Sequence, residues 1–411
     1  MVELIERPKY VEWLGRWRDT PLIKVITGVR RCGKSTLLEL YRRALLREGV
    51  RSSNMHTYNL EDPTLERSLV SGLGLYERVA STRNPDETTY VFIDEAQHLE
   101  EFERTVAGLN LLPRMDVYVT GSNSRFLTGD LATRLTGRYV EISMLPLSYA
   151  EFVSAPATQN RITPLEPGRP VPDPLYQYLE TGGFPFAVTL GQDPTMHRQY
   201  LSDILSSVIL KDVATRQRLV QPTAMLSVAT FLFDNIGNLT NTKRISDTLT
   251  SAGHTAGRVA VDNYLAGLVD AYLFYPVRRM DLRGRAILHG NAKYYAVDLG
   301  MRRAILGTGA ADIGRQLENL VYVELQRRGL PVHVGTGRHG EVDFVTGHGD
   351  DTTYIQVAHN VDNPNTLQRE LTPLKALPDQ YPKLLITTDT PGTLSHGGIR
   401  QVNVRDWLLD G

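Results

Sequence analysis

Apolar and polar residues alternate along the first third of the chain in blocks that predict strands and helices in turn. Residues 22–27, 88–93 and 115–119 form short, mostly apolar runs, which are typical of strands buried on both faces of a sheet. Residues 34–45, directly after the first run, place apolar side chains at the three- and four-residue spacing of an amphipathic helix. This order predicts an α/β core with a parallel sheet.

The pattern becomes helical in the middle of the chain. A proline-rich polar stretch at 154–174 predicts an irregular surface excursion, after which helical spacing returns. From residue 222, a helix, a turn and a second helix at about 256–271 precede two strands, at 273–281 and 292–300. Helix, turn, helix and hairpin in this order are typical of a winged helix.

The last hundred residues return to a mixed pattern of helices and strands. A helix is expected at 312–329, because Leu317, Leu320, Val321 and Leu325 share one of its faces. The elements expected after it are strands at 330–335, 341–347 and 352–358, a helix at 364–377, and strands at 383–389 and 399–404. A second α/β part is therefore predicted at the carboxyl end of the chain.

Composition limits the class of protein. A chain of 411 residues with 41% hydrophobic and 22% charged residues is typical of a globular protein of roughly two to four domains. The formal net charge is -1, so no global basic field favours nucleic acid, and the single cysteine, Cys32, excludes an internal disulfide. The amino terminus lacks the apolar run of a signal peptide, and no stretch approaches the ~18 apolar residues of a membrane span. We therefore expect a cytoplasmic protein with no membrane segment.

A phosphate-binding pattern lies between the first strand and the first helix. Residues 28–35 fit G-x-x-x-x-G-K-S, in which the glycines let successive N–H groups and the helix amino terminus point at a phosphate. Lys34 is expected to reach the β- and γ-phosphates of ATP, and Ser35 to bind Mg²⁺ through its hydroxyl. The predicted nucleotide-binding residues are Gly28, Val29, Arg30, Arg31, Cys32, Gly33, Lys34, Ser35 and Thr36.

Two carboxylates and a polar pair follow the next strands. Asp94 and Glu95 come directly after a buried strand, so Asp94 is expected to hold Mg²⁺ and Glu95 to deprotonate the attacking water. Ser122 and Asn123 follow the third strand, where either side chain can bond to the γ-phosphate or the water; the alternative is that they only make a turn. Together these residues predict Mg²⁺-dependent ATP hydrolysis.

Two arginines after the third strand are candidates for an arginine finger. Arg134 and Arg138 lie in the segment LATRLTGRYVEIS, and an arginine supplied by a neighbouring subunit often completes such a site. Either residue can instead pair within its own domain, and Arg138 is only slightly favoured. A finger requires a neighbour, so we expect a homo-oligomer such as a hexameric ring.

The segments GVRRCGKS, VFIDEAQHL, TGSNSRFL, LTGRYVEISMLPLSYAEF and YLETGGFP together resemble the prokaryotic AAA-type ATPases that carry a C-terminal domain. The resemblance spans nearly the whole chain and keeps the family order. It implies an AAA-type P-loop ATPase core at 1–145 and a helical lid at 146–215. It further implies a winged helix at 216–300 and an α/β restriction-endonuclease-like domain, of the PD-(D/E)xK type, at 301–411.

The nuclease-like part lacks a complete catalytic set. The resemblance places Glu318, Asp343 and Gln356 at its metal-binding positions, with Ala358 where a lysine is required. Gln356 offers only a neutral amide oxygen, whereas the chemistry needs carboxylates for Mg²⁺ and a cation that activates water. Arg369 or Lys375 could supply a cation from the next helix, although arginine is a poor proton shuttle. We expect a vestigial site in an inert or DNA-holding domain.

Arginines of the predicted winged helix are candidates for DNA contacts. They are Arg258 near the start of its second helix and Arg278, Arg279, Arg283 and Arg285 in the hairpin, where they can pair with phosphates. Winged helices also dock proteins, and a few arginines are ordinary on a solvated hairpin. The sequence leaves these alternatives open.

Three functions from different classes agree with these features. The first is ATP hydrolysis that drives the binding or remodelling of DNA, branched DNA included, by an oligomeric ATPase. The second is a regulatory switch in which ATP controls the docking of a protein partner. The third is a DNA nuclease licensed by ATP.

Overall fold

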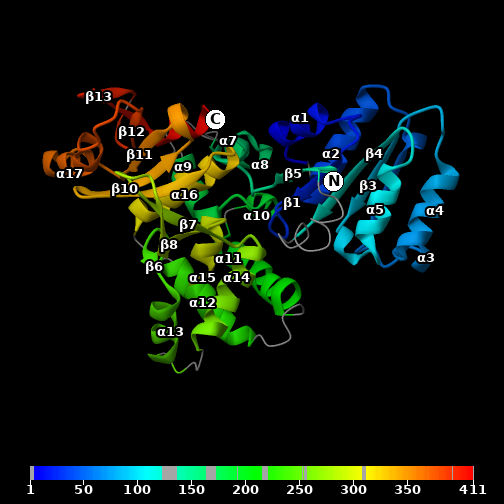
Figure 1. Ribbon diagram of the computed structural model, residues 1–411, viewed down its shortest axis with the longest axis horizontal. Helices are drawn as coiled ribbons and strands as arrows, with labels where there is room; N and C mark the ends of the chain where they lie inside the picture. The colour runs from blue at the N-terminus through cyan, green and yellow to red at the C-terminus, as the bar shows by residue number, and fades with distance from the viewer. Residues whose placement is uncertain are drawn as a thin grey trace. The chain divides into compact units, whose positions relative to one another are not determined.

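The structure, a computed structural model, describes residues 4–122, 137–162, 173–191, 193–214, 221–251, 253, 257–307, 312–390 and 392–410 (Figure 1). Its contacts divide the chain into two compact units. The first comprises Met1–Pro146 with Asp270–Tyr272, and the second comprises Leu147–Val269 with Leu273–Gly411. The four-part division expected from the sequence remains a prediction.

Unit 1 is built on a five-stranded sheet with the strand order β2-β3-β4-β1-β5. All four pairings are parallel, as the apolar runs predicted. The strands are β1 (Ile23–Thr27), β2 (Met55–Asn59), β3 (Thr89–Asp94), β4 (Met115–Gly121) and β5 (Tyr139–Ser143). The helices are α1 (Pro8–Arg16), α2 (Lys34–Arg47), α3 (Arg67–Val70), α4 (Gly72–Thr82) and α5 (Phe102–Asn110), with short 3-10 turns η1 (Ser52–Asn54) and η2 (Ala96–His98).

Helices cover both faces of this sheet, which explains why every residue of β1, β3 and β4 is buried. Leu75 and Val79 of α4 and Val106 and Leu109 of α5 pack with alternate strand residues in one apolar cluster. On the other face, the ring of Tyr41 of α2 packs edge-on against Phe92 and at a tilt against Tyr118. Burial on both faces is what the continuous apolar runs required.

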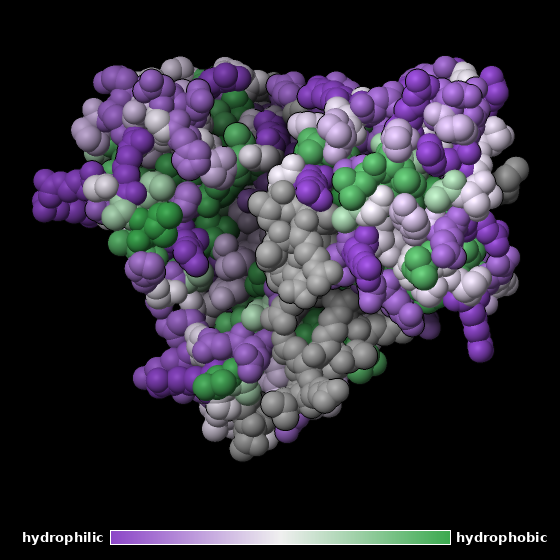
Figure 2. All heavy atoms as spheres, turned by 45° about the vertical axis from the view of Figure 1, so that its right-hand side comes forward, coloured by the Kyte–Doolittle hydropathy of each residue, from purple (hydrophilic) through white to green (hydrophobic). Residues whose placement is uncertain are grey.

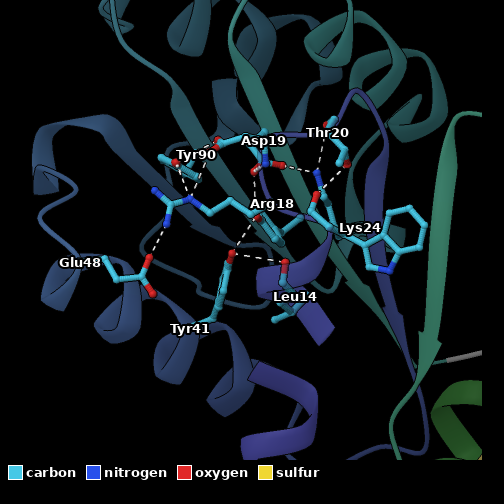
Figure 3. Close-up of polar contacts among 11 residues, drawn as sticks. Leu14, Arg18, Asp19, Thr20, Lys24, Tyr41, Glu48 and Tyr90 are labelled. Carbon is cyan, nitrogen blue, oxygen red and sulfur yellow. Dashed lines mark hydrogen bonds and ion pairs between the residues drawn. The ribbon is translucent and has the colours of Figure 1, made fainter. Parts of the chain in front are cut away.

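A buried polar network lies on the α2 face of the sheet (Figure 3). Lys24 of β1 and Asp116 of β4 form an ion pair of 2.5 Å between side chains that are both 0% exposed. Lys24 also donates to the carbonyl of Thr20 at 3.1 Å, and the hydroxyl of Tyr118 donates to Asp116 at 2.9 Å. Burial raises the pKa of Asp116, and Lys24 opposes that rise. The network fixes the two central strands, β1 and β4, to each other.

Unit 2 contains a nine-stranded mixed sheet with the order β13-β14-β12-β11-β10-β9-β7-β8-β6. Its strands are β6 (Leu239–Thr240), β7 (Phe274–Asp281), β8 (Ile287–Ala296), β9 (Val332–Gly337), β10 (Gly340–Thr346), β11 (Thr353–Val357), β12 (Lys383–Thr387), β13 (Leu394–His396) and β14 (Ile399–Asn403). The parallel pairing of β7 with β9 joins the hairpin β7–β8 to the carboxyl-terminal strands. The expected boundary at residue 300 therefore falls between elements that share one sheet.

The helices of unit 2 include three close to the spans predicted at 256–271, 312–329 and 364–377, whereas those at Thr242–Ser251 and Leu299–Leu306 were not predicted. The helices are α7 (Tyr149–Ser154), α8 (Pro156–Ile162), α9 (Pro174–Thr181), α10 (Pro185–Thr189), α11 (Pro194–Ser207), α12 (Pro222–Asp234), α13 (Thr242–Ser251), α14 (Arg258–Asp270), α15 (Leu299–Leu306), α16 (Ile313–Arg327), α17 (Pro364–Lys375) and α18 (Val404–Leu409), with a π-helix at Val208–Ala214 and a 3-10 turn at Gly349–Asp351. Helix α8 occupies part of the stretch that was expected to be irregular. Its proline stands at the first helical position, where the missing N–H has no cost.

A buried carboxylate links two segments of unit 2. Asp298 caps α15 by accepting the N–H of Met301 at 2.9 Å, and it also accepts the N–H of Gly183 at 2.6 Å. A β-carbon on the neighbouring Gly182 would lie 2.2 Å from Asp298 Oδ1, so only glycine fits there. Burial raises the pKa of Asp298 to about 6, against the lowering effect of these N–H groups.

The face drawn in Figure 2 carries mainly hydrophilic side chains, with hydrophobic ones in small groups. No helix among the described residues has both the length and the apolar character needed to cross a membrane.

Candidate active site

The loop after β1 has the backbone geometry that a phosphate cradle requires. Gly28 has a φ of 144°, and a β-carbon there would lie 2.2 Å from the carbonyl oxygen of Met144. Gly33 has a φ of 107° and is the N-cap residue of α2, where it has no side chain to bond to the first N–H groups of the helix. These N–H groups therefore remain available to an anion at the positive end of the helix dipole.

Lys34 lies folded against its own loop. Its side chain is buried, and Nζ donates to the carbonyls of Gly28 at 3.0 Å and Val29 at 3.2 Å. Oxygen atoms of a bound phosphate can replace these carbonyls as acceptors, and a phosphate adds full opposite charge. The geometry therefore agrees with the predicted role of Lys34.

Arg7 holds the loop from outside the motif. It is buried and donates to the carbonyl of Cys32 at 3.2 Å and to the carbonyl of Leu145 at 2.8 Å. Cys32 itself is fully buried, and burial raises the pKa of its thiol. Its side chain is thus a packing group within the loop, while its carbonyl is the acceptor through which Arg7 fixes the loop.

The two predicted Mg²⁺ ligands, Ser35 and Asp94, lie together. The Ser35 hydroxyl hydrogen-bonds to Asp94, and Thr120 Oγ1 donates to Asp94 Oδ1 at 2.5 Å. Burial raises the pKa of Asp94, and these two hydrogen bonds oppose the rise. A hydroxyl and a carboxylate are oxygen ligands of the kind that Mg²⁺ prefers, so the donor set fits a magnesium ion.

Glu95 is buried and held in an unusual backbone conformation. Its φ of 53° lies in the left-handed region, and its N–H donates to Thr120 Oγ1 at 2.9 Å. Gln97 Nε2 donates to Glu95 Oε2 and lies 3.5 Å from Ser122 Oγ. Ser122 is buried at the end of β4, so the structure brings Glu95 and Ser122 together through Gln97.

A second polar group lies beside the loop. Arg30 forms an ion pair with Glu61, and His98 Nε2 lies 4.0 Å from Glu61 Oε1. Glu61, Glu95 and His98 each offer one ligand atom, and these atoms lie within 4.8 Å of one another. Glu61 and His98 follow no motif, so the sequence did not single them out.

Arg138 lies at the other end of the sheet from the loop. Its carbonyl accepts the N–H of Ile23, the first residue of β1, and its side chain is exposed. The loop begins after the last residue of β1, five residues later, so the length of the strand, about 15 Å, separates the two. The backbone of Arg138 is therefore about one strand length away from its own loop. Asn123 and Arg134 lie outside the described residues.

The predicted nuclease positions are close together in unit 2, with a lysine that the sequence did not indicate. Lys293 of β8 forms ion pairs with Glu318 at 2.8 Å and with Glu341 at 2.6 Å. Asp343 is buried and accepts the N–H of Val357 at 2.9 Å. Burial raises the pKa of Asp343 well above its ordinary value, and Glu318 adds to the rise.

Arg369 does not supply the cation that was considered for the predicted nuclease site. That guanidinium pairs with Glu370 at 2.8 Å, while Gln356 donates its amide to the same carboxylate at 3.0 Å. Lys375 is exposed. Lys293 is the cation among the carboxylates instead, because the pairing of β7 with β9 brings the hairpin into this sheet.

The predicted DNA-binding arginines differ in their surroundings. Arg258, Arg278 and Arg283 are exposed, whereas Arg279 is half-buried in β7. Arg285 contacts four side chains of unit 2, namely Thr352 at 3.3 Å, Tyr354 at 3.5 Å, Asp379 at 3.9 Å and the ring of Tyr381 at 4.8 Å. These contacts compete with any pairing of Arg285 with a phosphate.

Two segments of the chain match known protein families. Residues 20–153 match the family described as an AAA domain, and residues 173–312 match a domain of unknown function. An uncharacterised protein of Haemophilus influenzae is 38% identical over 411 residues, 99% of each chain. An uncharacterised protein of Methanocaldococcus jannaschii is 28% identical over 356 residues, 85% of this chain and 77% of the other.

Among solved structures, a Walker-type ATPase of Pyrococcus abyssi aligns with a TM-score of 0.50. The two chains are 16% identical, and the alignment covers 74% of this chain and 96% of the other. The likeness concerns the fold. With the AAA match, it confirms the predicted α/β fold and AAA-type P-loop core. The chain belongs to the same family as the Haemophilus influenzae protein, and in its amino-terminal part it carries an AAA-type domain.

Proposed function

We propose that the protein hydrolyses ATP with Mg²⁺ at the loop of residues 28–36. The observation that carries this is the contact between Ser35 and Asp94 next to the buried Glu95, at the amino terminus of α2. Ser35 follows the loop and Asp94 ends β3, so two distant segments supply one set of oxygen ligands. Mg²⁺ held there would neutralise charge on the transferred phosphate.

The chain's own groups then have separate tasks. The loop N–H groups and Lys34 hold the phosphates, which requires Lys34 to exchange its carbonyl acceptors for phosphate oxygens. Glu95 accepts a proton from the attacking water, and its buried position and fixed backbone N–H keep it in place. Ser122, directly after β4, lies 3.5 Å from the amide nitrogen of Gln97, which in turn donates to Glu95.

We further propose that hydrolysis drives the binding or remodelling of DNA by an oligomer. Support comes from the element order α12, β6, α13, α14, β7 and β8, in which β6 pairs with β8. This is the order expected for a winged helix, and Arg258, Arg278 and Arg283 are exposed on it. Exposed arginines can pair with phosphates without regard to sequence.

The docking of a protein partner under ATP control is the second candidate. Two observations favour it. Arg285 contacts the ring of Tyr381 within unit 2. Strand β7 lies inside the sheet, between β9 and β8, so less of the hairpin is free to enter a DNA groove. A nuclease is disfavoured, because Lys293 already neutralises Glu318 and Glu341.

One experiment separates these functions. ATP turnover is measured with single-stranded, duplex and four-way DNA, with the oligomeric state determined in parallel with and without nucleotide. Stimulation several-fold by DNA, lost in the variant Arg258→Ala/Arg278→Ala/Arg283→Ala, supports remodelling. Turnover that no DNA changes supports the switch, and Mg²⁺-dependent nicking lost in Asp343→Ala supports the nuclease.

A further inference from the structure

Gln97 lies two residues beyond Glu95, in the 3-10 turn η2, and the phosphate-binding motifs give it no role. Its Nε2 donates to Glu95 Oε2, and this bond fixes the orientation of the amide group. A carboxylate only accepts hydrogen bonds, so the nitrogen of the amide must face it. The amide oxygen, Oε1, consequently points away from Glu95 Oε2.

That amide oxygen has no hydrogen-bond partner. Gln97 Oε1 is buried, and among the described residues none donates to it. Buried carbonyl oxygens are nearly always paired, so an unpaired one beside a catalytic carboxylate indicates a donor that arrives with the substrate. A water molecule at the γ-phosphate is such a donor.

We propose that Gln97 orients the attacking water in ATP hydrolysis, an inference that rests on the proposed function. The water donates one proton to Glu95 and the other to Gln97 Oε1, which turns a lone pair of its oxygen toward the γ-phosphorus. The bond from the water oxygen to phosphorus forms as the bond from phosphorus to the bridging oxygen of ADP breaks. ADP leaves with that electron pair, and Glu95 takes the proton of the water.

The surroundings of Gln97 give it a fixed place from which to act. The backbone of Glu95 is held by its N–H bond to Thr120, and Ser122 Oγ lies 3.5 Å from the Gln97 nitrogen. The amide therefore spans the ends of β3 and β4. A glutamate at position 97 would repel Glu95, and an alanine would lose both the donor and the acceptor.

The test compares Gln97→Ala and Gln97→Glu with the wild type in steady-state ATP hydrolysis. We expect kcat to fall on the order of 10²-fold, the usual contribution of one positioned group in proton transfer, while KM and the dissociation constant for ATP change less than about two-fold. Arg104→Ala is the matched control: Arg104 is an exposed residue of α5 that pairs with Glu101, so this variant should hydrolyse ATP as the wild type does. In the Glu95→Gln background, Gln97→Ala should cause no further loss, because the two residues act on one water.

A binding measurement keeps the inference testable apart from turnover. ADP with aluminium fluoride mimics the transition state and its in-line water, so Gln97→Ala should bind it at least ten-fold more weakly than the wild type while binding ADP equally. Equal affinity for the mimic, wild-type turnover in Gln97→Ala, or additive losses with Glu95→Gln would each overturn the role of Gln97. Wild-type protein that does not hydrolyse ATP, or that hydrolyses it as fast as Lys34→Ala, would instead overturn the proposed function.

Discussion

At the scale of single residues, Lys34 supplies the positive charge that is predicted to bind the phosphates. Replacement by alanine removes the ammonium group that donates to two carbonyls of the loop. We expect Lys34→Ala to lose measurable ATP binding in titration calorimetry, since a charge-assisted bond to phosphate is among the stronger kinds. Lys9→Ala, an exposed lysine of α1, should bind ATP normally. Full ATP affinity in Lys34→Ala would contradict the site.

A second prediction at this scale concerns Asp298. Its pKa is about 6 in the folded protein, against about 3.9 for an unfolded chain. The folded state therefore binds the proton more tightly. Its contribution to stability is full below about pH 4 and is lost as the pH rises through about 6, a change of about 3 kcal/mol.

The measurement is urea unfolding of the wild type and Asp298→Asn from pH 4 to 8. Asparagine does not titrate, so the stability difference between the two proteins should change from about pH 4 upward and become constant only about one pH unit above 6. A difference that is constant over the whole range would show that the Asp298 pKa is not raised.

The sequence indicated the site residues that lie within a motif, but not those that the fold brings to the site from other segments. Gly28, Lys34 and Asp94 follow from spacing, because a glycine turn and a buried strand place them locally. Thr120 and Gln97 do not, because their roles depend on the distance between the ends of β3 and β4. Arg7 belongs to no motif, although its side chain donates a hydrogen bond to the loop carbonyl of Cys32.

At the scale of elements, the hydrophobic pattern predicted where strands lie in the sequence, but not which strands pair in the sheet. The spans of β10, β11 and β12 agree with the predicted ones, and the pairing of β7 with β9 does not follow from either span. That pairing is decided by contacts between strands more than fifty residues apart. It is also why Lys293, and neither Arg369 nor Lys375, lies among the carboxylates.

Lys293 joins three elements, β8, α16 and β10, through Glu318 and Glu341. Lys293→Met should leave Glu318 buried without its cation, and loss of one partner of a buried pair costs about 3–5 kcal/mol. Urea unfolding should show this loss, whereas Lys375→Met, an exposed lysine, should unfold like the wild type.

The same variant tests whether the lysine takes the place of a metal. Mn²⁺ should stabilise Lys293→Met and leave the wild type unchanged, because removal of the ammonium exposes carboxylates to a cation. Stability of Lys293→Met equal to that of the wild type would show that the ion pairs contribute nothing.

At the scale of the whole molecule, the two units occur in one chain in this protein and in its Haemophilus influenzae relative, which align over 99% of each. The first unit contains the loop, the carboxylates and Gln97, whereas Arg138 lies at the far end of the same sheet. If Arg138 is an arginine finger, this distance favours action on the loop of another subunit. That hypothesis predicts a site that is complete only in an oligomer.

This expectation leads to a mixing experiment with Arg138→Ala and Glu95→Gln. Each variant alone should bind ATP with wild-type affinity and hydrolyse it slowly, since an arginine finger contributes about 10³–10⁵ in rate where it has been measured. Mixed oligomers contain interfaces in which an intact Arg138 faces an intact Glu95, so activity should return in part when the two proteins are combined. Arg104→Ala mixed with Glu95→Gln provides the reference for simple dilution. Arg138→Ala with full activity on its own would exclude the finger, and no recovery on mixing would place any effect of Arg138 within its own subunit.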